Sequence, residues 1–167
     1  MAVGSADIHK AVTTLWTDSG LNWEFQKFWA AGDRTKFTAL NDAEATPDGP
    51  WPYCVFEQEA GAVQTRMTSA NDDADEGGEI QDVPFQFRVH ARQVDTDARS
   101  AKGIAAALID LIMQKFGGHP SIKPQVMELD NGSVMTVQKL NDFGVRTGDT
   151  EYEWVLSYNF KIAVPVM

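Results

Sequence analysis

The residues with the clearest potential for chemistry are the carboxylates between Asn71 and Asp82. The candidate site consists of Asp72, Asp73, Asp75, Glu76 and Glu79. Clustered carboxylates are typical of sites for hard cations, and the spacing Asp73-x-Asp75 matches the start of a calcium-binding loop. The later ligands of that pattern, including its final glutamate, do not follow. The sequence therefore does not favour a specific metal site here.

The same acidic stretch is better interpreted as a mobile, solvent-exposed loop. No Lys or Arg appears between Arg66 and Arg88, so the negative charges repel one another without compensation. The pair Gly77-Gly78 adds backbone freedom. We predict that this loop becomes ordered only against a neighbouring subunit, or that it lines a channel.

Motifs of catalysis or cofactor binding are absent from the sequence. It has no phosphate-binding glycine loop, dinucleotide fingerprint, zinc-protease helix or paired-cysteine motif, and no serine has a nucleophile-elbow setting. The three histidines, His9, His90 and His119, are far apart in the sequence. The single cysteine, Cys54, lies in a strand-like run and is predicted to be a buried, inert thiol. We therefore expect no enzymatic activity, no metal and no cofactor.

The main structural element is the segment from Val83 to Gly118. It begins with a strand whose apolar and polar residues alternate, because Phe85, Phe87 and Val89 share one face with Val83 and Ala91. The period then changes to that of an amphipathic helix over residues 96–116. The apolar residues at helical spacing are Ala101, Ile104, Ala105, Leu108, Leu111, Ile112 and Phe116. Thr96 is predicted to cap this helix, and Gly117-Gly118 to end it.

Further elements are predicted on both sides of this segment. Residues 6–18 have a helical apolar stripe, and residues 21–31 form a second, shorter one. Strands are predicted at 35–41, 53–58, 63–69, 126–129, 134–140 and 151–164, with 53–58 and 63–69 forming a hairpin. The predicted fold is a single α+β domain over 1–167, with a mostly antiparallel sheet packed against a long central helix and an N-terminal helix.

Aromatic residues are concentrated near the N-terminus. This aromatic group consists of Trp16, Trp23, Phe25, Phe28 and Trp29. Large rings of this kind form either core or a surface that binds another copy or a partner. The sequence leaves both interpretations open.

The composition narrows the class of partner. The chain has 167 residues, 43% hydrophobic and 23% charged, which suits one globular domain. No apolar run reaches the roughly 20 residues of a membrane helix, and the N-terminus has no secretory-signal pattern, so no membrane partner is expected. The formal net charge of −10 argues against a protein that grips nucleic acid through its phosphates. DNA that slides past the protein remains compatible with this charge.

The order of elements, together with three local segments, resembles the tail-terminator or tail-completion proteins of long-tailed bacteriophages. Pro52 to Phe56 is similar to a strand of that family, and Val83–Val94 followed by Asp97–Phe116 is similar to its long strand and helix. Residues 151–164 are similar to its closing strand. The resemblance runs from Asp7 to Val164 and lies in hydrophobic patterns rather than in chemical signatures.

This resemblance implies a structural protein of the virion neck, assembled in the host cytoplasm. Such proteins form a ring, usually six-fold, on the head-proximal end of the tail tube. Their expected partners are other copies of the same chain, the tail tube protein, the head connector or stopper protein, and genomic DNA that passes through the channel without specific binding. The alternatives are another neck or tail-tube protein, or a small-molecule-binding α+β domain.

Overall fold

The computed structural model describes residues 5–42, 50–58, 63–66, 79–94, 97–117, 126–128 and 134–164. The helices in these ranges are α1 (Ser5–Asp18), α2 (Leu21–Gln26) and α3 (Ala101–Phe116). The strands are β1 (Leu40–Asp42), β2 (Tyr53–Gln58), β3 (Val63–Arg66), β4 (Glu79–Arg92), β5 (Val126–Glu128), β6 (Val134–Arg146) and β7 (Glu151–Val164). The predicted α+β class is confirmed. None of the described helices is long and apolar enough to cross a membrane.

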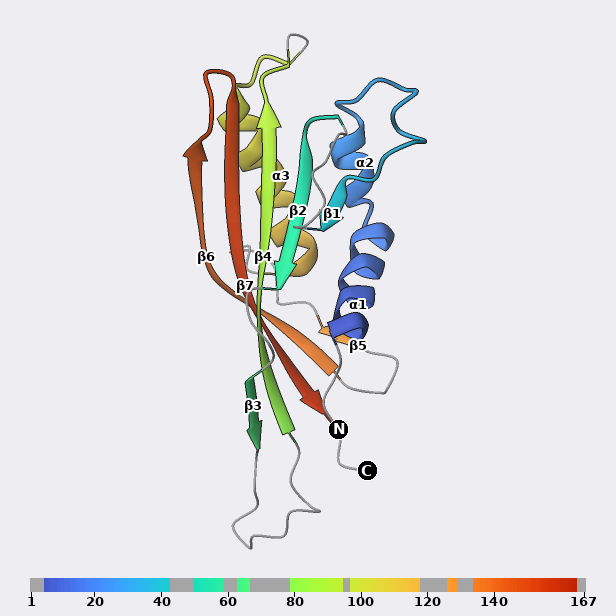
Figure 1. The fold of residues 1–167 in the computed structure, drawn as a ribbon, viewed down its shortest axis with the longest axis vertical. Helices are drawn as coiled ribbons and strands as arrows, with labels where there is room; N and C mark the ends of the chain where they lie inside the picture. Colours follow the sequence, from blue (N-terminus) through green and yellow to red (C-terminus); the bar gives the residue numbers. More distant parts are fainter. Residues whose placement is uncertain are drawn as a thin grey trace, which may run out of the picture.

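The strands form one sheet in the order β1-β2-β4-β7-β6-β5, with β3 also paired to β4 (Figure 1). The sheet is mixed, since β1 is parallel to β2 and the other pairs are antiparallel. The prediction of a mostly antiparallel sheet is therefore met in part. The longest pairing joins β4 to β7, from Glu79 opposite Val164 to Arg92 opposite Glu151.

The predicted hairpin between residues 53–58 and 63–69 is wrong. β2 and β3 do not pair with each other; both pair with β4, β2 along Phe85–His90 and β3 along Glu79–Asp82. The two short strands therefore follow one another along a single edge of β4. This arrangement is possible because β4 has 14 residues, which is long enough to hold both.

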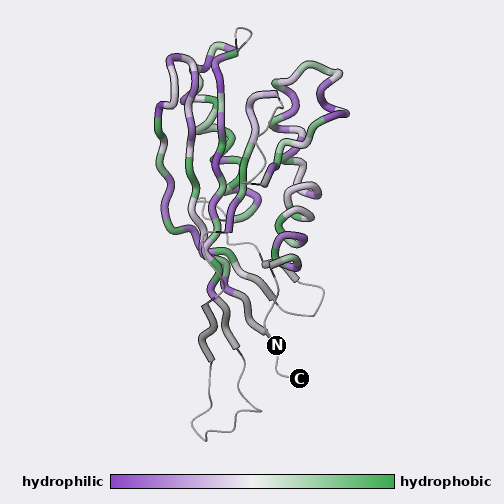
Figure 2. The backbone as a smooth tube through the Cα atoms, in the orientation of Figure 1, coloured by the Kyte–Doolittle hydropathy of each residue, from purple (hydrophilic) through white to green (hydrophobic). Residues whose placement is uncertain are grey.

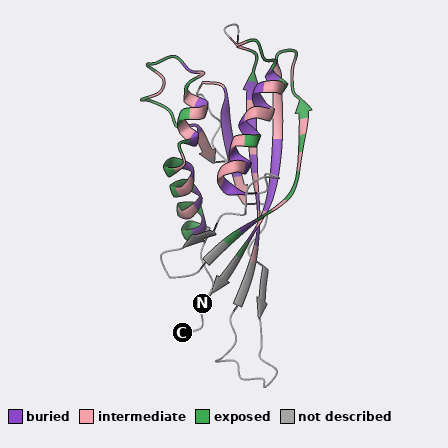
Figure 3. Cartoon of the chain, turned by 180° about the vertical axis from the view of Figure 1, so that it is seen from behind, coloured by how far each residue is buried: buried purple, intermediate pink, exposed green. Residues whose placement is uncertain are grey.

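The core lies between the sheet and the helices. Alternate residues of β4, among them Phe85, Phe87 and Val89, are fully or almost fully buried. They pack with the apolar faces of α1 and α3 and with Leu156 and Phe160 of β7 in one cluster. Figure 3 shows the buried residues on the central strands and the exposed ones on β6 and on the outer side of α1. Hydrophilic and hydrophobic residues occur together along the long strands in Figure 2, as expected for strands with one covered face.

Helix α3 begins later than predicted. Ser100 is its N-cap, and the Ser100 hydroxyl accepts a hydrogen bond of 3.2 Å from the Gly103 amide. Asp97 does not interact with the first turn of the helix. Its carboxylate instead accepts hydrogen bonds from the amide and the guanidinium of Arg99, which hold a bend ahead of the helix. The predicted cap, Thr96, lies outside the described residues.

Glycines end the first and third helices, as the sequence predicted. Gly20, with φ 79°, separates α1 from α2, and Gly117, with φ 115°, follows α3. Only glycine adopts such values readily. The carbonyl of Gly117 accepts a hydrogen bond of 2.6 Å from the hydroxyl of Tyr158, which ties the end of α3 to β7. Burial raises the pKa of the Tyr158 hydroxyl, so the donor proton stays in place.

Two strand predictions also need correction. Residues 35–39 are not a strand, because the amides of Lys36 and Phe37 both bond to the carbonyl of Asp33 in a turn, and β1 begins only at Leu40. β6 continues beyond residue 140, through a stretch predicted to be a connection. There the carboxylate of Asp142 accepts from the indole of Trp154 at 2.9 Å and pairs with Lys139 at 2.6 Å. Burial raises the pKa of Asp142, but these hydrogen bonds outweigh it and the pKa is lowered.

Gly144 on β6 leads to a stability prediction. A side chain at this position would overlap the ring of Tyr152 on β7. Gly144→Ala should therefore force the ring to move and destabilise the fold by about 1–3 kcal/mol, measured as a lower melting temperature.

The matched control is Gly32→Ala, since a side chain at Gly32 would meet no atom within 4 Å. A combined Gly144→Ala, Tyr152→Ala variant should lose less stability than the sum of the two single variants. An unchanged melting temperature for Gly144→Ala would contradict this packing.

Candidate assembly surfaces and pocket

The acidic candidate site is not brought together by the described structure. Asp72, Asp73, Asp75 and Glu76 lie outside the described residues. Glu79 is the first residue of β4 rather than part of a loop, and only its backbone is described. The nearby Asp82 lies within β4, where its carboxylate accepts a hydrogen bond of 3.0 Å from Asn159 and lies 4.0 Å from the Lys161 amine. The inter-subunit or channel role of the loop stays a prediction.

The described residues contain no group of His, Cys, Asp and Glu side chains that could hold a metal ion. Cys54 is fully buried, as predicted, and burial raises the pKa of its thiol well above the ordinary value. His9 and His90 lie on different elements, α1 and β4, and His119 lies outside the described residues. The expectation of no enzymatic activity and no cofactor stays a prediction.

The first notable surface lies on β6. Leu140, Phe143 and Val145, which we call the β6 patch, have exposed fractions of 56%, 48% and 47%. The pairing of β6 with β7 shifts its register between Lys139 and Asn141, which leaves Leu140 as an extra residue at a bulge. The sequence placed these residues at the end of a strand and in a connection. The alternation of Phe143 and Val145 with polar residues was the signal for a continuing strand.

The β6 patch also lies on a free edge of the sheet. β5 pairs with β6 only along Val134–Thr136, so from Val137 to Arg146 no described strand covers the outer side of β6. An uncovered strand with exposed apolar side chains is a preferred place for association with another chain.

The second notable surface lies at α2 and the turns that follow it. Trp23 is 54% exposed and Phe37 is 37% exposed; we call this pair the α2 patch. The guanidinium of Arg34 lies 5.1 Å from the centre of the Trp23 ring. The same guanidinium donates to the carbonyls of Gln26 at 2.9 Å, Lys27 at 3.4 Å and Trp29 at 3.1 Å. These bonds fix the loop, so Trp23 projects from a firmly held surface.

The N-terminal aromatic group thus divides between the two interpretations that the sequence left open. Trp16, Phe25 and Trp29 are core residues, with exposed fractions of 1%, 0% and 4%. The indole of Trp16 donates to Asn22 at 2.9 Å, and the indole of Trp29 donates to the carbonyl of Pro52 at 2.9 Å. Trp23 alone among the tryptophans of this group faces solvent.

The two patches lie on opposite sides of the domain. β6 is toward one end of the sheet order, while the chain that carries Phe37 leads into β1 at the other end. In Figure 1, β6 lies on the left and α2 on the upper right, and Figure 3 shows the same separation from behind. The described large hydrophobic residues that are strongly exposed belong to one patch or the other.

An aromatic cluster occupies the face of the sheet away from α3. The rings of Tyr53 and His90 stack with centroids 4.8 Å apart, and Trp51 meets both edge-on. The guanidinium of Arg92 lies 4.0 Å from the centre of the Trp51 ring and pairs with Glu151 at 3.0 Å. Burial lowers the pKa of His90 and raises that of Tyr53. The rings pack on one another, and the charge of Arg92 is balanced by Glu151, so we interpret the cluster as one that stabilises this face of the sheet.

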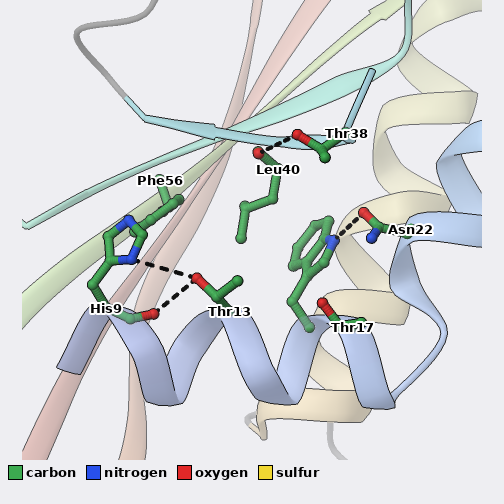
Figure 4. A pocket seen from close by; sticks show the side chains of 8 residues that line it. His9, Thr13, Thr17, Asn22, Thr38, Leu40 and Phe56 are labelled. Atoms are coloured by element: carbon green, nitrogen blue, oxygen red, sulfur yellow. Dashed lines mark hydrogen bonds between the residues drawn. The ribbon is translucent and has the colours of Figure 1, made fainter. Parts of the chain in front are cut away.

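A small pocket lies between α1 and the strands β1 and β2 (Figure 4). Its volume is about 150 Å³, and its lining combines Thr13 and Thr17 with apolar Leu40. The Thr13 hydroxyl donates to the His9 carbonyl at 2.8 Å, and the His9 ring packs 4.5 Å from that of Phe56. Pockets that bind cofactors or metabolites typically measure about 300–1,000 Å³. This one holds only a few atoms.

Comparison with known proteins leaves the family open. No protein-family model matches the chain, and no curated protein is significantly similar to it.

Proposed function

We propose that this chain is a tail-terminator or tail-completion protein of a long-tailed bacteriophage. It forms a ring, six-fold in the form expected for the family, that caps the head-proximal end of the tail tube and presents the surface on which the head connector docks. It resides in the neck of the virion and acts without catalysis. The observation that carries the proposal is the pair of exposed apolar patches on opposite sides of one domain.

A ring requires subunits that carry two different contact surfaces. In a ring of three or more copies, each copy must offer two different surfaces, one to the copy before it and one to the copy after it. The β6 patch and the α2 patch provide two such surfaces on opposite sides of the domain. The order of elements adds support. A helix at the N-terminus, a long strand followed by a helix, and a closing antiparallel strand pair occur in the order that the resemblance implies.

The charge of the chain suits a channel for DNA. With a formal net charge of −10 on every copy, a ring repels the phosphates and lets DNA slide rather than bind. Ring formation should depend on salt, because acidic faces of neighbouring copies repel less when they are screened. Two hollows beside α1 are candidate sites for the small-molecule-binding alternative: one of about 150 Å³ at Thr13 and Leu40, and one of about 460 Å³ at Thr14 and Asp18. The first is smaller than a usual ligand site, and the second lies open along the exposed side of one helix, whereas ligand sites usually enclose most of the ligand.

The proposal predicts a defect in virion assembly when the protein is removed. A phage that lacks it should produce full heads and separate tails of uncontrolled length, visible by negative-stain electron microscopy. Supplying the wild-type protein in trans should restore joined particles. Normal tails attached to heads in its absence would contradict the assignment. So would a purified protein that polymerises without limit, which would indicate a tube subunit.

A further inference from the structure

We propose that the β6 patch of one copy docks on the α2 patch of the next copy, in a head-to-tail contact. The occupant of each patch is therefore a second copy of this chain. This inference rests on the proposed ring and names the surfaces that close it.

The distribution of exposed apolar area is the first argument. Single exposed hydrophobic residues are common on protein surfaces, but contiguous or paired ones indicate contact sites. On β6 the exposed side chains of the patch lie along one free strand edge. At α2 the side-chain amide of Gln26 donates to the Phe37 carbonyl at 3.5 Å, which holds the chain at Phe37 against the helix that carries Trp23. If a patch bound its own equivalent on another copy, two molecules would complete the assembly as a two-fold dimer. Head-to-tail docking satisfies both patches and continues until a ring closes.

The rigidity of both patches is the second argument. Arg34 donates three hydrogen bonds to backbone carbonyls of the chain that follows Trp23, and its guanidinium lies 5.1 Å from the centre of the Trp23 ring. Phe143 and Val145 lie on a strand that pairs with β7 along its length. Aromatic anchors on fixed supports lose little conformational entropy on binding, which is why Trp and Tyr dominate the energetics of interfaces.

Among the described residues, cations without an ion pair lie beside the α2 patch, and a carboxylate without one lies beside the β6 patch. Within the described part of the chain, Arg34 and Lys36 beside the α2 patch form no ion pair with a carboxylate. Beside the β6 patch, Glu153 lies directly opposite Val145 in the strand register and also has no ion pair in that part of the chain. Asp149, at the turn that follows β6, already pairs with Arg146 at 3.8 Å. Head-to-tail docking brings Arg34 and Lys36 toward Glu153.

The test measures the molecular mass of two single variants, alone and mixed, by light scattering after size-exclusion chromatography. Phe143→Asp destroys the β6 patch and leaves the α2 patch, and Trp23→Asp does the opposite. Each variant alone should be monomeric, with the midpoint concentration of assembly raised at least about 100-fold. Mixed in equal amounts, the two should form dimers that do not grow further, because each pair has only one intact junction.

Controls separate docking from folding. Thr14→Asp lies on the exposed side of α1, outside both patches, and should assemble like the wild type. Both patch variants should melt within a few degrees of the wild type. If Phe143→Asp melts early, Val145→Lys tests the same patch with a longer side chain that reaches solvent. A charge exchange provides an independent readout: Glu153→Lys and Lys36→Glu should each weaken assembly, and the double variant should recover part of the loss.

The outcomes distinguish the two proposals. Rings from both patch variants would overturn this docking and leave the proposed function standing. A dimer of either variant alone would show that a patch binds its own equivalent, and would also overturn it. A wild-type protein that is monomeric at every concentration would refute the ring itself.

Discussion

Replacing Leu108 by aspartate is expected to abolish folding. Leu108 lies in the middle of α3, is 2% exposed and belongs to the core between α3 and the sheet. An aspartate there would bury a charge without a partner, and the cost of several kcal/mol is comparable to the whole stability of an ordinary domain. Circular dichroism should show loss of the cooperative melting transition. A variant that retained the wild-type melting temperature would show that this face of α3 is not buried.

The matched control places the same aspartate on the other side of the same helix. Lys102 is exposed in the first turn of α3, near the positive end of the helix dipole. Lys102→Asp should therefore fold and melt close to the wild type. The contrast assigns the effect of Leu108→Asp to burial rather than to helix propensity or to net charge.

Replacing Phe87 by alanine is expected to have the second-largest effect. Phe87 is fully buried and its ring meets three other elements. The centroid distances are 6.1 Å to Trp16 of α1, 5.0 Å to Phe116 of α3 and 5.9 Å to Tyr158 of β7. Removing the ring leaves a cavity that all three elements border, so we expect the free energy of unfolding to fall by about 3–5 kcal/mol. Denaturant titration gives this value directly.

Phe143→Ala serves as the comparison, because Phe143 is also a phenylalanine of the sheet but is 48% exposed. It should change the free energy of unfolding of the isolated chain by less than about 1 kcal/mol. Equal losses at Phe87 and Phe143 would be incompatible with the described burial.

The parts of the fold that followed from the sequence are those governed by hydrophobic period. The alternation around Phe87 predicted β4, and the helical spacing around Leu108 predicted α3, because each pattern matches one covered face. The errors arose where turn chemistry was overridden by tertiary contacts. Asn141-Asp142 has the composition of a turn, yet the indole of Trp154 and the amine of Lys139 hold Asp142 within a strand.

Strand partners were less predictable than strands. The wrong hairpin prediction has a physical cause. Only four residues separate β2 from β3, and a connection of this length is compatible with a hairpin and also with two strands that pair in succession with the same third strand. Only the length of β4 decides between a hairpin and two strands placed in succession along β4. The sequence did not predict the first residues of β4, because Glu79 belongs to an acidic stretch that was assigned to a loop. The sequence pointed to the α2 patch through its N-terminal aromatic group. It could not show that Trp23 is exposed whereas Trp16 and Phe25 are buried. The β6 patch was not predicted, because the predicted strand ended at residue 140 and Phe143 and Val145 were assigned to a connection.

The position of β7 affects how the chain reaches its native state. β7 is synthesised after every other described strand, yet it lies between β4 and β6 in the sheet. Its pairing with β4 joins residues as far apart as Glu79 and Val164, so the contact order is high and a slow, late folding step is expected. Until β7 leaves the ribosome, the apolar faces of β4 and α3 lack their partner and are vulnerable to aggregation. Folding is therefore delayed until translation has passed residue 164, and the proposed ring can assemble only after that.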